Sequence, residues 1–396
     1  MSCRLLVVGS SFWPLVNDSA LRLMHWASHL QQRDVYATIV TPRWHTTWPT
    51  QGVCREVPFY RLLPPPKSGW SQSHFLKNLA RWVILHQKEF DAIYVDEPFS
   101  LLHQLAQSKV RQTLPLLGRF HAASIASHPL HDPAASLASA AEACRKLDRV
   151  IVPDADSDRR ARAAGIQPDK IIRIPDVAWL QTRRETMALQ VAKRALAKVS
   201  SDFTLPPRDR LIVGFGDISK RSGMELLAKA VGPLWDSNQA LSVWWIGDGD
   251  FKRPFFEWLR DQSWHRDFLM HGAFDSIEEL LQLADLVVFP GEGTSTQFYL
   301  PAVIGSGVPF LASSSQDAKW MINDPVLQER FLLPAGNVEI WEKRIRSWME
   351  DPLPLQDDAW KAQLAFQNQF PSSQNVESWM ELLDEIARPR NHDTTR

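Results

Sequence analysis

The chain has 396 residues, which is too long for one ordinary hydrophobic core and therefore predicts two domains. Its content of 44% hydrophobic and 22% charged residues is typical of a soluble globular protein. The three cysteines have no paired or metal-type spacing, which argues against a disulfide framework or a zinc site and favours a reducing compartment, and no apolar run approaches the roughly 18 residues of a membrane span.

The first half of the chain alternates short apolar runs with amphipathic segments. The run at 4–10 is too short for a secretory signal and is predicted as a strand, followed by a helix from Ser19 to about Gln32. Further strands are predicted at 37–42, 90–98, 114–121 and 148–154. Because each run ends in Gly, Pro, His or Asp, the strand ends are expected to open onto a ligand crevice.

A charged segment at 182–209 ends in Pro206-Pro207 and is predicted as the linker. The alternation then restarts, with strands expected at 211–216, 241–250, 267–272, 284–291 and 308–313. We therefore expect an α/β protein with two doubly wound Rossmann-like domains facing each other across a cleft. The expected division is a first domain at 1–181, the linker, a second domain at 210–372, and a C-terminal helix and tail at 373–396.

The turn within "LIVGFGDISKRSGMELLAKAV" (211–231) is the most informative local motif. Gly216 lets the backbone approach a ligand, and the helix that follows can be capped by Ser219 or Ser222. A helix N-terminus attracts anions, so phosphate is the expected guest, with Lys220 and Arg221 beside it. The alternative is a glycine turn that closes a strand–helix unit without any ligand.

Four segments, taken in order, resemble the retaining nucleotide-sugar glycosyltransferases of the GT-B fold, the glycosyl transferases group 1. They are "KLDRVIVPDADSDRRARAAGIQPDKIIRIPDVAW" (146–179), "VWWIGDGDFKRPFFEWLR" (243–260), "FLMHGAFDSIEELLQLADLVVFPG" (268–291) and "EGTSTQFYLPAVIGSGVPFLAS" (292–313). The resemblance covers most of the chain and implies the GT-B fold and a nucleotide-sugar donor.

The resemblance also shows departures in the diphosphate-binding turn. The family carries an Arg and a Lys at the positions that Asp217 and Ser222 hold in this chain. Either Lys220 and Arg221 substitute for them, since both side chains are long, or the site does not hold a diphosphate in the usual manner.

The donor segment keeps one of two family glutamates. Glu292 matches the first, which contacts the sugar, whereas the second falls at Leu300 or Ala302. The four residues after Glu292 offer N–H and hydroxyl donors to a phosphate: Gly293, Thr294, Ser295 and Thr296. The alternative role for Glu292 is that of a carboxylate stabilised at a helix start.

In the first domain, the resemblance places His121 near the reacting sugar, with a strand-end histidine satisfied by backbone groups as the alternative. The family's Gly-Gly loop is replaced by residues that include Asn17 and Asp18, which we place on the acceptor side. Both tolerate some glycine conformations and can cap the next helix, but they admit a ligand less closely.

Charge is distributed unevenly along the chain. Residues 1–200 hold 26 Lys and Arg against 16 Asp and Glu, a net +10, and the remainder holds 18 against 29, a net −11. This split indicates either an anionic partner for the first half, such as a membrane surface, or two domains that attract each other. The segment 67–88 has an apolar helical stripe flanked by basic residues, which suits either membrane docking or burial in its own domain.

From these features we expect a cytoplasmic, metal-independent retaining hexosyltransferase without a bound cofactor. Its substrates would be a nucleotide sugar and a glycan, lipid or small-molecule acceptor, with peripheral contact to the inner membrane face as an option and no nucleic-acid partner. The alternatives are a non-catalytic GT-B relative that binds a nucleotide or glycan, and a GT-B sugar epimerase.

Overall fold

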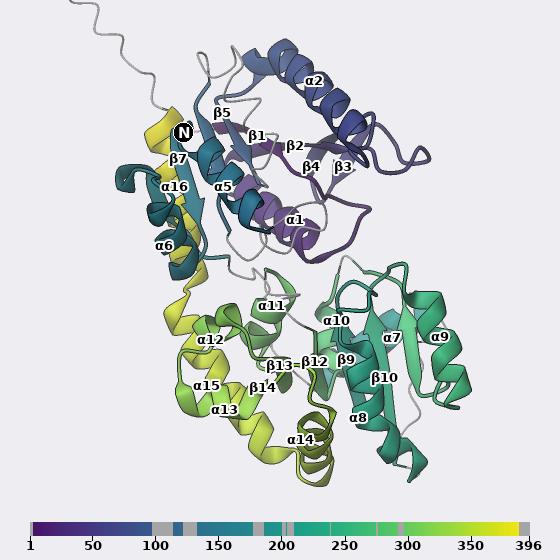
Figure 1. Cartoon of the computed structure of the whole chain (residues 1–396). Coiled ribbons are helices and arrows are strands. Elements are labelled where there is room, and N and C mark those ends of the chain that lie inside the picture. The colour runs from purple at the N-terminus through teal and green to yellow at the C-terminus, as the bar shows by residue number, and fades with distance from the viewer. Residues whose placement is uncertain are drawn as a thin grey trace, which may run out of the picture. The chain divides into compact units, whose positions relative to one another are not determined.

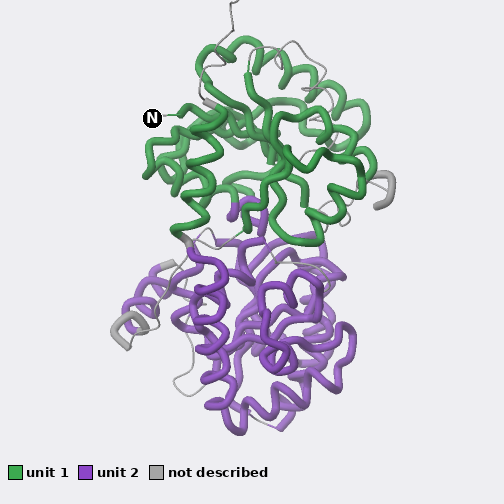
Figure 2. The backbone as a smooth tube through the Cα atoms, turned by 90° about the vertical axis from the view of Figure 1, so that its left-hand side faces the viewer, with its two compact units in different colours: residues 1–15, 23–176, 372–396 green, residues 16–22, 177–371 purple. Residues whose placement is uncertain are grey.

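A computed structural model describes residues 3–96, 114–121, 133–176, 186–199, 203, 210–237, 239–274, 276–291 and 297–387 (Figure 1). The chain divides into two compact units (Figure 2). Unit 1 comprises Met1–Leu15, Leu23–Asp176 and Ser372–Arg396, and unit 2 comprises Val16–Arg22 and Val177–Pro371. The second unit thus includes a short piece of the N-terminal sequence.

Unit 1 is built on an eight-stranded sheet in the order β3-β4-β2-β1-β5-β6-β7-β8, in which only the β3–β4 pair is antiparallel. Its central strands are almost wholly apolar and buried, as parallel strands covered on both faces must be. The strands are β1 (Cys3–Val8), β2 (Val35–Pro42), β3 (Gln51–Cys54), β4 (Val57–Leu62), β5 (Ala92–Val95), β6 (Leu116–Arg119), β7 (Arg149–Val152) and β8 (Ile171–Arg173).

The helices associated with this sheet include one from the far end of the sequence. Helix α16 packs on β1 and β5, where Trp379 contacts Trp26 and Tyr94 at ring-centroid distances of 4.9 and 5.3 Å. Helix α16 is therefore part of the core of unit 1. The helices are α1 (Asp18–Gln31), whose first residues belong to unit 2, α2 (Gly69–His86), η1 (Gln87–Glu89), α5 (Pro133–Cys144), α6 (Ala155–Ala163), η3 (Pro168–Lys170) and α16 (Ser372–Ala387).

Unit 2 contains a six-stranded, wholly parallel sheet in the order β11-β10-β9-β12-β13-β14. This is the strand order of the dinucleotide-binding fold. The strands are β9 (Arg210–Phe215), β10 (Leu241–Ile246), β11 (Phe268–His271), β12 (Leu286–Phe289), β13 (Phe310–Ser313) and β14 (Leu332–Leu333).

The helices of unit 2 include α7, which lies within the segment predicted as a linker and packs against α10. The helices are α7 (Thr186–Val199), α8 (Met224–Asp236), α9 (Lys252–Asp261), α10 (Glu278–Leu283), α11 (Tyr299–Ser306), α12 (Gln316–Met321), α13 (Pro325–Phe331), α14 (Val338–Glu350) and α15 (Leu353–Gln369). The predicted fold class, two Rossmann-like α/β domains with parallel sheets, is confirmed.

The apolar stripe of the segment 67–88 is part of the core and is not a free docking face. Helix α2 buries Phe75, Leu76, Leu79 and Val83 in the cluster that also holds β1 and β5 side chains. Each such side chain stabilises the fold by about 1.5–3 kcal/mol when buried, so this face stays within unit 1. No helix in the described part of the chain is long and apolar enough to cross a membrane.

The cysteines differ in accessibility, which predicts a labelling pattern. Cys3 and Cys144 are buried, and burial raises the pKa of Cys3 to about 11 and that of Cys144 to about 12. Cys54 is half-buried. We expect a thiol reagent at pH 8 to modify Cys54 alone in the native protein and all three cysteines after unfolding, because the thiolate is the reactive form. Mass spectrometry of the labelled peptides checks this, and native labelling of Cys144 would contradict it.

Candidate functional site

The strand order of unit 2 places the switch point of its sheet at the carboxyl ends of β9 and β12. These strands are neighbours, yet the chain leaves β9 toward β10 on one side and β12 toward β13 on the other. Loops that diverge in this way leave a crevice between them, and ligands of open parallel sheets bind there. The loop after β9 is 216–223 and the loop after β12 begins at 290.

These two loops are packed backbone against backbone. Gly223 has φ +79°, and a Cβ there would lie 2.4 Å from the carbonyl carbon of Pro290 and 2.6 Å from the nitrogen of Gly291. A Cβ on Gly291 would lie 2.7 Å from the carbonyl oxygen of Ser222. The hydroxyl of Ser313 donates to the Pro290 carbonyl at 2.8 Å and fixes the second loop. Only glycine allows the loops to meet this closely.

The predicted site residue Gly216 is held from the neighbouring strand β10. The indole N–H of Trp245 donates to the Gly216 carbonyl at 3.0 Å, and the Ile218 N–H donates to the Asp248 carbonyl at 2.9 Å. Gly247 approaches so closely that a Cβ would lie 1.9 Å from the Gly216 carbonyl oxygen. The two glycine turns therefore form one rigid edge.

Lys220 and Arg221 lie in the first loop and are exposed, so both can reach a bound anion. The prediction that Ser219 or Ser222 caps the following helix is wrong. Gly223 is the N-cap of α8 and provides no side-chain cap, because the Ser222 hydroxyl donates instead to the Ser219 carbonyl at 2.7 Å. The first N–H groups of α8 thus have no side-chain acceptor from their own cap residue.

Asp217 stands where the resemblance leads one to expect an arginine. Solvent reaches this residue, yet partial desolvation of its carboxylate raises its pKa. An ionised carboxylate at this position repels a diphosphate, whereas the arginine of the family would attract it.

Asp18 lies within unit 2, in the segment 16–22. Three consecutive backbone N–H groups donate to its carboxylate, those of Gln297, Phe298 and Tyr299, at 2.7, 2.9 and 2.9 Å. Burial raises the pKa of Asp18, although these hydrogen bonds and Arg22 oppose the shift. The carboxylate therefore occupies the N-terminus of α11.

Asn17 has a different role, since its side-chain oxygen accepts the N–H of Ala20 at 2.9 Å. It caps the first turn of α1, as an Asn before a helix is expected to do. The two neighbouring polar residues are thus divided between two helices, with Asn17 serving α1 and Asp18 serving α11.

Two aromatic residues beside these loops were not among the predicted site residues. Tyr299 is buried and stacks on Phe215 at a ring-centroid distance of 5.0 Å and an interplanar angle of 18°. Burial raises the pKa of Tyr299 well above its usual value, and the carboxylates of Asp18 and Asp217 raise it further. The phenol is therefore neutral and lies within electrostatic range of both acids.

The predicted donor segment lies outside the described residues. Glu292, Gly293, Thr294, Ser295 and Thr296 all belong to it. Their assignment stays a prediction, placed between the described loop end at Gly291 and the start of α11.

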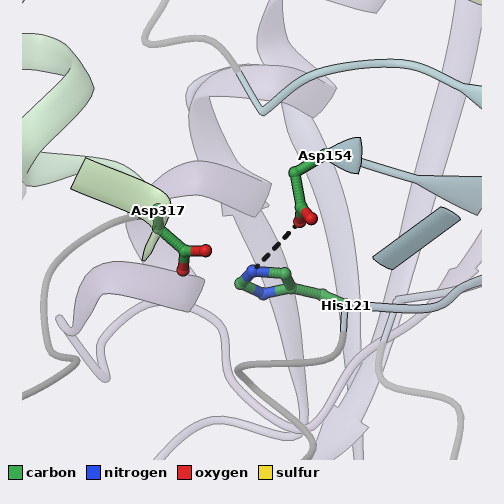
Figure 3. Close-up of side chains that lie close together, drawn as sticks. All are labelled: His121, Asp154 and Asp317. Atoms are coloured by element: carbon green, nitrogen blue, oxygen red, sulfur yellow. Dashed lines mark ion pairs between the residues drawn. The ribbon is translucent and has the colours of Figure 1, made fainter. Parts of the chain in front are cut away.

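In unit 1, the predicted residue His121 follows β6, and Asp154 follows the neighbouring strand β7 (Figure 3). The imidazole Nε2 lies 3.7 Å from an Asp154 carboxylate oxygen, and both residues are buried. Asp154 is the N-cap of α6 and accepts the N–H and the hydroxyl of Ser157, both at 2.7 Å. The carboxylate is thus fixed where it faces the imidazole, an arrangement that can orient the ring.

Both halves of the chain match known family models. Residues 20–176 match the model described as Glycosyltransferase Family 4, and residues 209–351 match Glycosyl transferases group 1. A comparison with curated protein sequences gives no match.

Solved structures share the fold over nearly the whole chain. HepE from Anabaena in complex with UDP-glucose is 16% identical with a TM-score of 0.71, over 97% of this chain and 100% of that one. Sucrose-phosphate synthase from Thermosynechococcus elongatus is 14% identical with a TM-score of 0.74, over 96% and 98%. WaaG, a glycosyltransferase involved in lipopolysaccharide biosynthesis, is 12% identical with a TM-score of 0.69, over 96% and 99%.

At these identities the structural likeness shows the fold alone. The family matches add that one domain model covers most of the sequence before residue 177 and the other most of the sequence after residue 208. Together, the two domain matches and the shared fold support a glycosyltransferase of the GT-B type.

Proposed function

We propose that this protein transfers a hexose from a nucleotide sugar to an acceptor with retention of configuration. The observation that carries the proposal is the pair of closely packed loops after β9 and β12, at the switch point of a group 1 domain. The structure of HepE, which shares the fold, was solved in complex with UDP-glucose. A uridine nucleotide sugar is therefore the first donor to test.

In this proposal, the loop after β9 holds the diphosphate. Lys220 and Arg221 supply positive charge, and Gly216, which has no side chain, lets the diphosphate come close to the backbone. Glu292 accepts hydrogen bonds from the sugar hydroxyls, and the four residues after it bind phosphate. The leaving diphosphate takes the proton of the incoming hydroxyl on the same face, and stabilising its charge is the protein's main contribution. No metal ion is called upon.

The acceptor, in this proposal, binds on unit 1, where His121 lies near the reacting sugar. A histidine there can share a proton with a substrate hydroxyl near neutral pH. The acceptor is a glycan, a lipid or a small molecule, and the net charge of +10 over residues 1–200 favours one with an anionic group or one at an anionic membrane.

A second candidate function is a non-catalytic relative that binds a nucleotide or glycan. The observation that favours it is the presence of Asp217 and Asp18 at the loop edges where a diphosphate would need positive charge. A transferase should release UDP from UDP-glucose even with water as acceptor, whereas a non-catalytic relative should bind its nucleotide or glycan without turnover.

The proposal predicts that Lys220→Ala combined with Arg221→Ala weakens UDP binding at least tenfold. Hydrogen bonds to charged groups are worth about 1.5–3 kcal/mol each, so losing two should exceed one factor of ten. Isothermal titration calorimetry of the double variant against wild type measures this. Lys229→Ala on the exposed face of α8 is the matched control, because it removes one positive charge outside the loop. Unchanged affinity in a correctly folded double variant would overturn the assignment.

A further inference from the structure

Two arginines of unit 1 lie among aromatic side chains at one edge of its sheet. The loop after β1, the loop after β2 and the end of β4 contribute to this group, the Arg–Trp cluster, whose members are Trp13, Arg43, Trp48, Phe59 and Arg61. Strands β1, β2 and β4 are parallel neighbours, so their carboxyl ends meet there. Ligands of parallel α/β sheets bind at this edge.

Arg61 is a buried cation whose neighbours are rings and backbone carbonyls. It is 3% exposed, and its guanidinium carbon lies 4.0, 5.5 and 5.9 Å from the ring centroids of Phe59, Trp48 and Trp13. Its Nη atoms donate to the carbonyls of Pro49 and Trp13, whereas its buried Nε has no hydrogen-bond partner among the described residues. A cation buried to this extent is normally paired with an opposite charge.

Arg43 adds a second positive charge to the cluster. It is half-buried, and its Nε and Nη2 donate to the carbonyls of Trp48 and Thr46 at 2.7 and 2.5 Å, which leaves Nη1 available. Within the described residues, no carboxylate pairs with either arginine. Burial lowers the pKa of Arg61 to about 10, an effect that Cys54 opposes and Arg43 reinforces. Two cations without a counter-charge favour the binding of an anion.

Two half-buried indoles give the cluster a flat apolar surface. Trp13 and Trp48 both remain partly accessible to solvent. Arg61 holds the carbonyl of Trp13 and Arg43 holds that of Trp48, so the two arginines fix the backbone that carries the indoles. The negative face of an aromatic ring attracts the C–H groups of a sugar, which neighbouring oxygens polarise. A guanidinium binds carboxylate or phosphate through two parallel N–H groups, so the combination suits a sugar ring that carries an anionic group.

The cluster lies at the same edge of the sheet as His121. Strands β4, β2, β1, β5 and β6 are parallel neighbours in that order, so their carboxyl ends share one edge. The ends of β2 and β6 are three strand spacings apart, about 14 Å. A glycan that reaches from His121 to the cluster therefore places a sugar other than the reacting one on the indoles.

We propose that the Arg–Trp cluster is an acceptor subsite for an anionic sugar, a pyranose ring that carries a carboxylate or a phosphate. An indole of the cluster stacks on the ring, Nη1 of Arg43 donates to the anionic group, and Arg61 adds buried positive charge. The inference rests on the proposed function in that it takes this sugar to be part of the acceptor. It places the preference for an anionic acceptor on two named residues rather than on the net charge of the first half of the chain.

The test is a ligand-observed NMR titration of the full chain with four probes. Methyl β-glucuronide and glucose 6-phosphate each carry a ring and a charge, methyl β-glucoside carries the ring alone, and acetate carries the charge alone. Arg43→Gln removes the positive charge, and Trp48→Leu removes the indole but keeps the carbonyl that Arg43 holds. Arg81→Gln and Trp70→Leu are the matched controls, because they make the same changes on the exposed face of α2. Melting temperatures show whether each variant folds.

We expect wild type to bind at least one of the two anionic sugars tenfold or more tightly than methyl β-glucoside or acetate, and the tighter of the two identifies the anionic group. Arg43→Gln should weaken binding of that sugar at least tenfold and leave the glucoside unchanged, whereas Trp48→Leu should weaken both. The controls should stay within twofold of wild type.

Equal affinity for the anionic sugars and the glucoside in wild type would overturn the inference. So would an equal loss in Arg43→Gln and Arg81→Gln, because binding would then follow net charge alone. If Arg43→Gln does not fold, unchanged affinity in Trp48→Leu would overturn it. UDP binding to wild type is measured in parallel: anionic-sugar binding that depends on Arg43 without any UDP binding would support the subsite and refute the proposed nucleotide-sugar donor.

Discussion

Gly223→Ala is expected to lower the free energy of unfolding of unit 2 by about 2–5 kcal/mol. An alanine at φ +79° costs about 1–2 kcal/mol from its own backbone. Its Cβ would also lie 2.4–2.6 Å from backbone atoms of Pro290 and Gly291, and overpacking of this kind costs about 1–3 kcal/mol more. Urea unfolding followed by tryptophan fluorescence measures the loss.

Two other glycines separate these contributions. Gly336 has φ +76° and no heavy atom within 4 Å of a built Cβ, so Gly336→Ala should cost only the backbone contribution, about 1–2 kcal/mol. Gly69, at the start of α2, also has no heavy atom within 4 Å of a built Cβ, and its φ is not in the left-handed region. Gly69→Ala should therefore leave the stability nearly unchanged. If Gly223→Ala costs no more than Gly336→Ala, the loops after β9 and β12 are not packed as described.

The strands that could be predicted from sequence are those whose apolar run carries its own signal. Strands β1, β9 and β12 read as continuous buried runs ended by turn residues, and each appears near its predicted position. By contrast, β3 reads QGVC with an alternately exposed pattern, and β14 has two residues. Such strands are fixed by their neighbours rather than by their own residues.

The residues of the candidate site also differ in whether local sequence or tertiary structure places them. Gly216, Lys220 and Arg221 share one strand–turn–helix unit, so local chemistry places them together. The hydrogen bond from the Gln297 N–H to Asp18 spans 279 residues and follows from tertiary structure, which no local sequence pattern predicts. The error over the cap of α8 has a local cause, because Ser222 closes its own turn onto Ser219 and leaves the cap position to Gly223.

The contact between His121 and Asp154 could have been predicted. His121 and Asp154 are the last residues of two predicted strands, 114–121 and 148–154, and β6 and β7 are parallel neighbours, so the carboxyl ends of these strands meet at one edge of the sheet. Each predicted strand ends in a side chain that can carry charge, which is the pattern expected at a ligand crevice. Asp154 also lies in a family-like segment, 146–179, but the resemblance implies a role near the reacting sugar only for His121.

The second large effect is expected at this pair, where His121→Asn should lower kcat/KM for sugar transfer about 10²-fold, the lower end of a typical general acid–base contribution. Asp154 does not need to touch substrate to matter, because it lies 3.7 Å from the imidazole and can fix the orientation of the ring. Asp154→Ser should therefore lower kcat/KM about tenfold, a loss of about 1.4 kcal/mol of transition-state stabilisation, because the imidazole loses the carboxylate that orients it. UDP release from UDP-glucose, with kcat and KM determined separately, gives the readout.

The choice of serine separates orientation of His121 from capping of α6. Asp154 accepts the Ser157 N–H at 2.7 Å, and serine is nearly as good an N-cap, so Asp154→Ser should retain stability. Asp154→Ala removes the cap as well and should cost a further ~1 kcal/mol of stability. If Asp154→Ser keeps full turnover while Asp154→Ala loses stability and turnover together, the carboxylate serves the helix alone. A fall in kcat with an unchanged melting temperature in Asp154→Ser would instead place its action on the histidine.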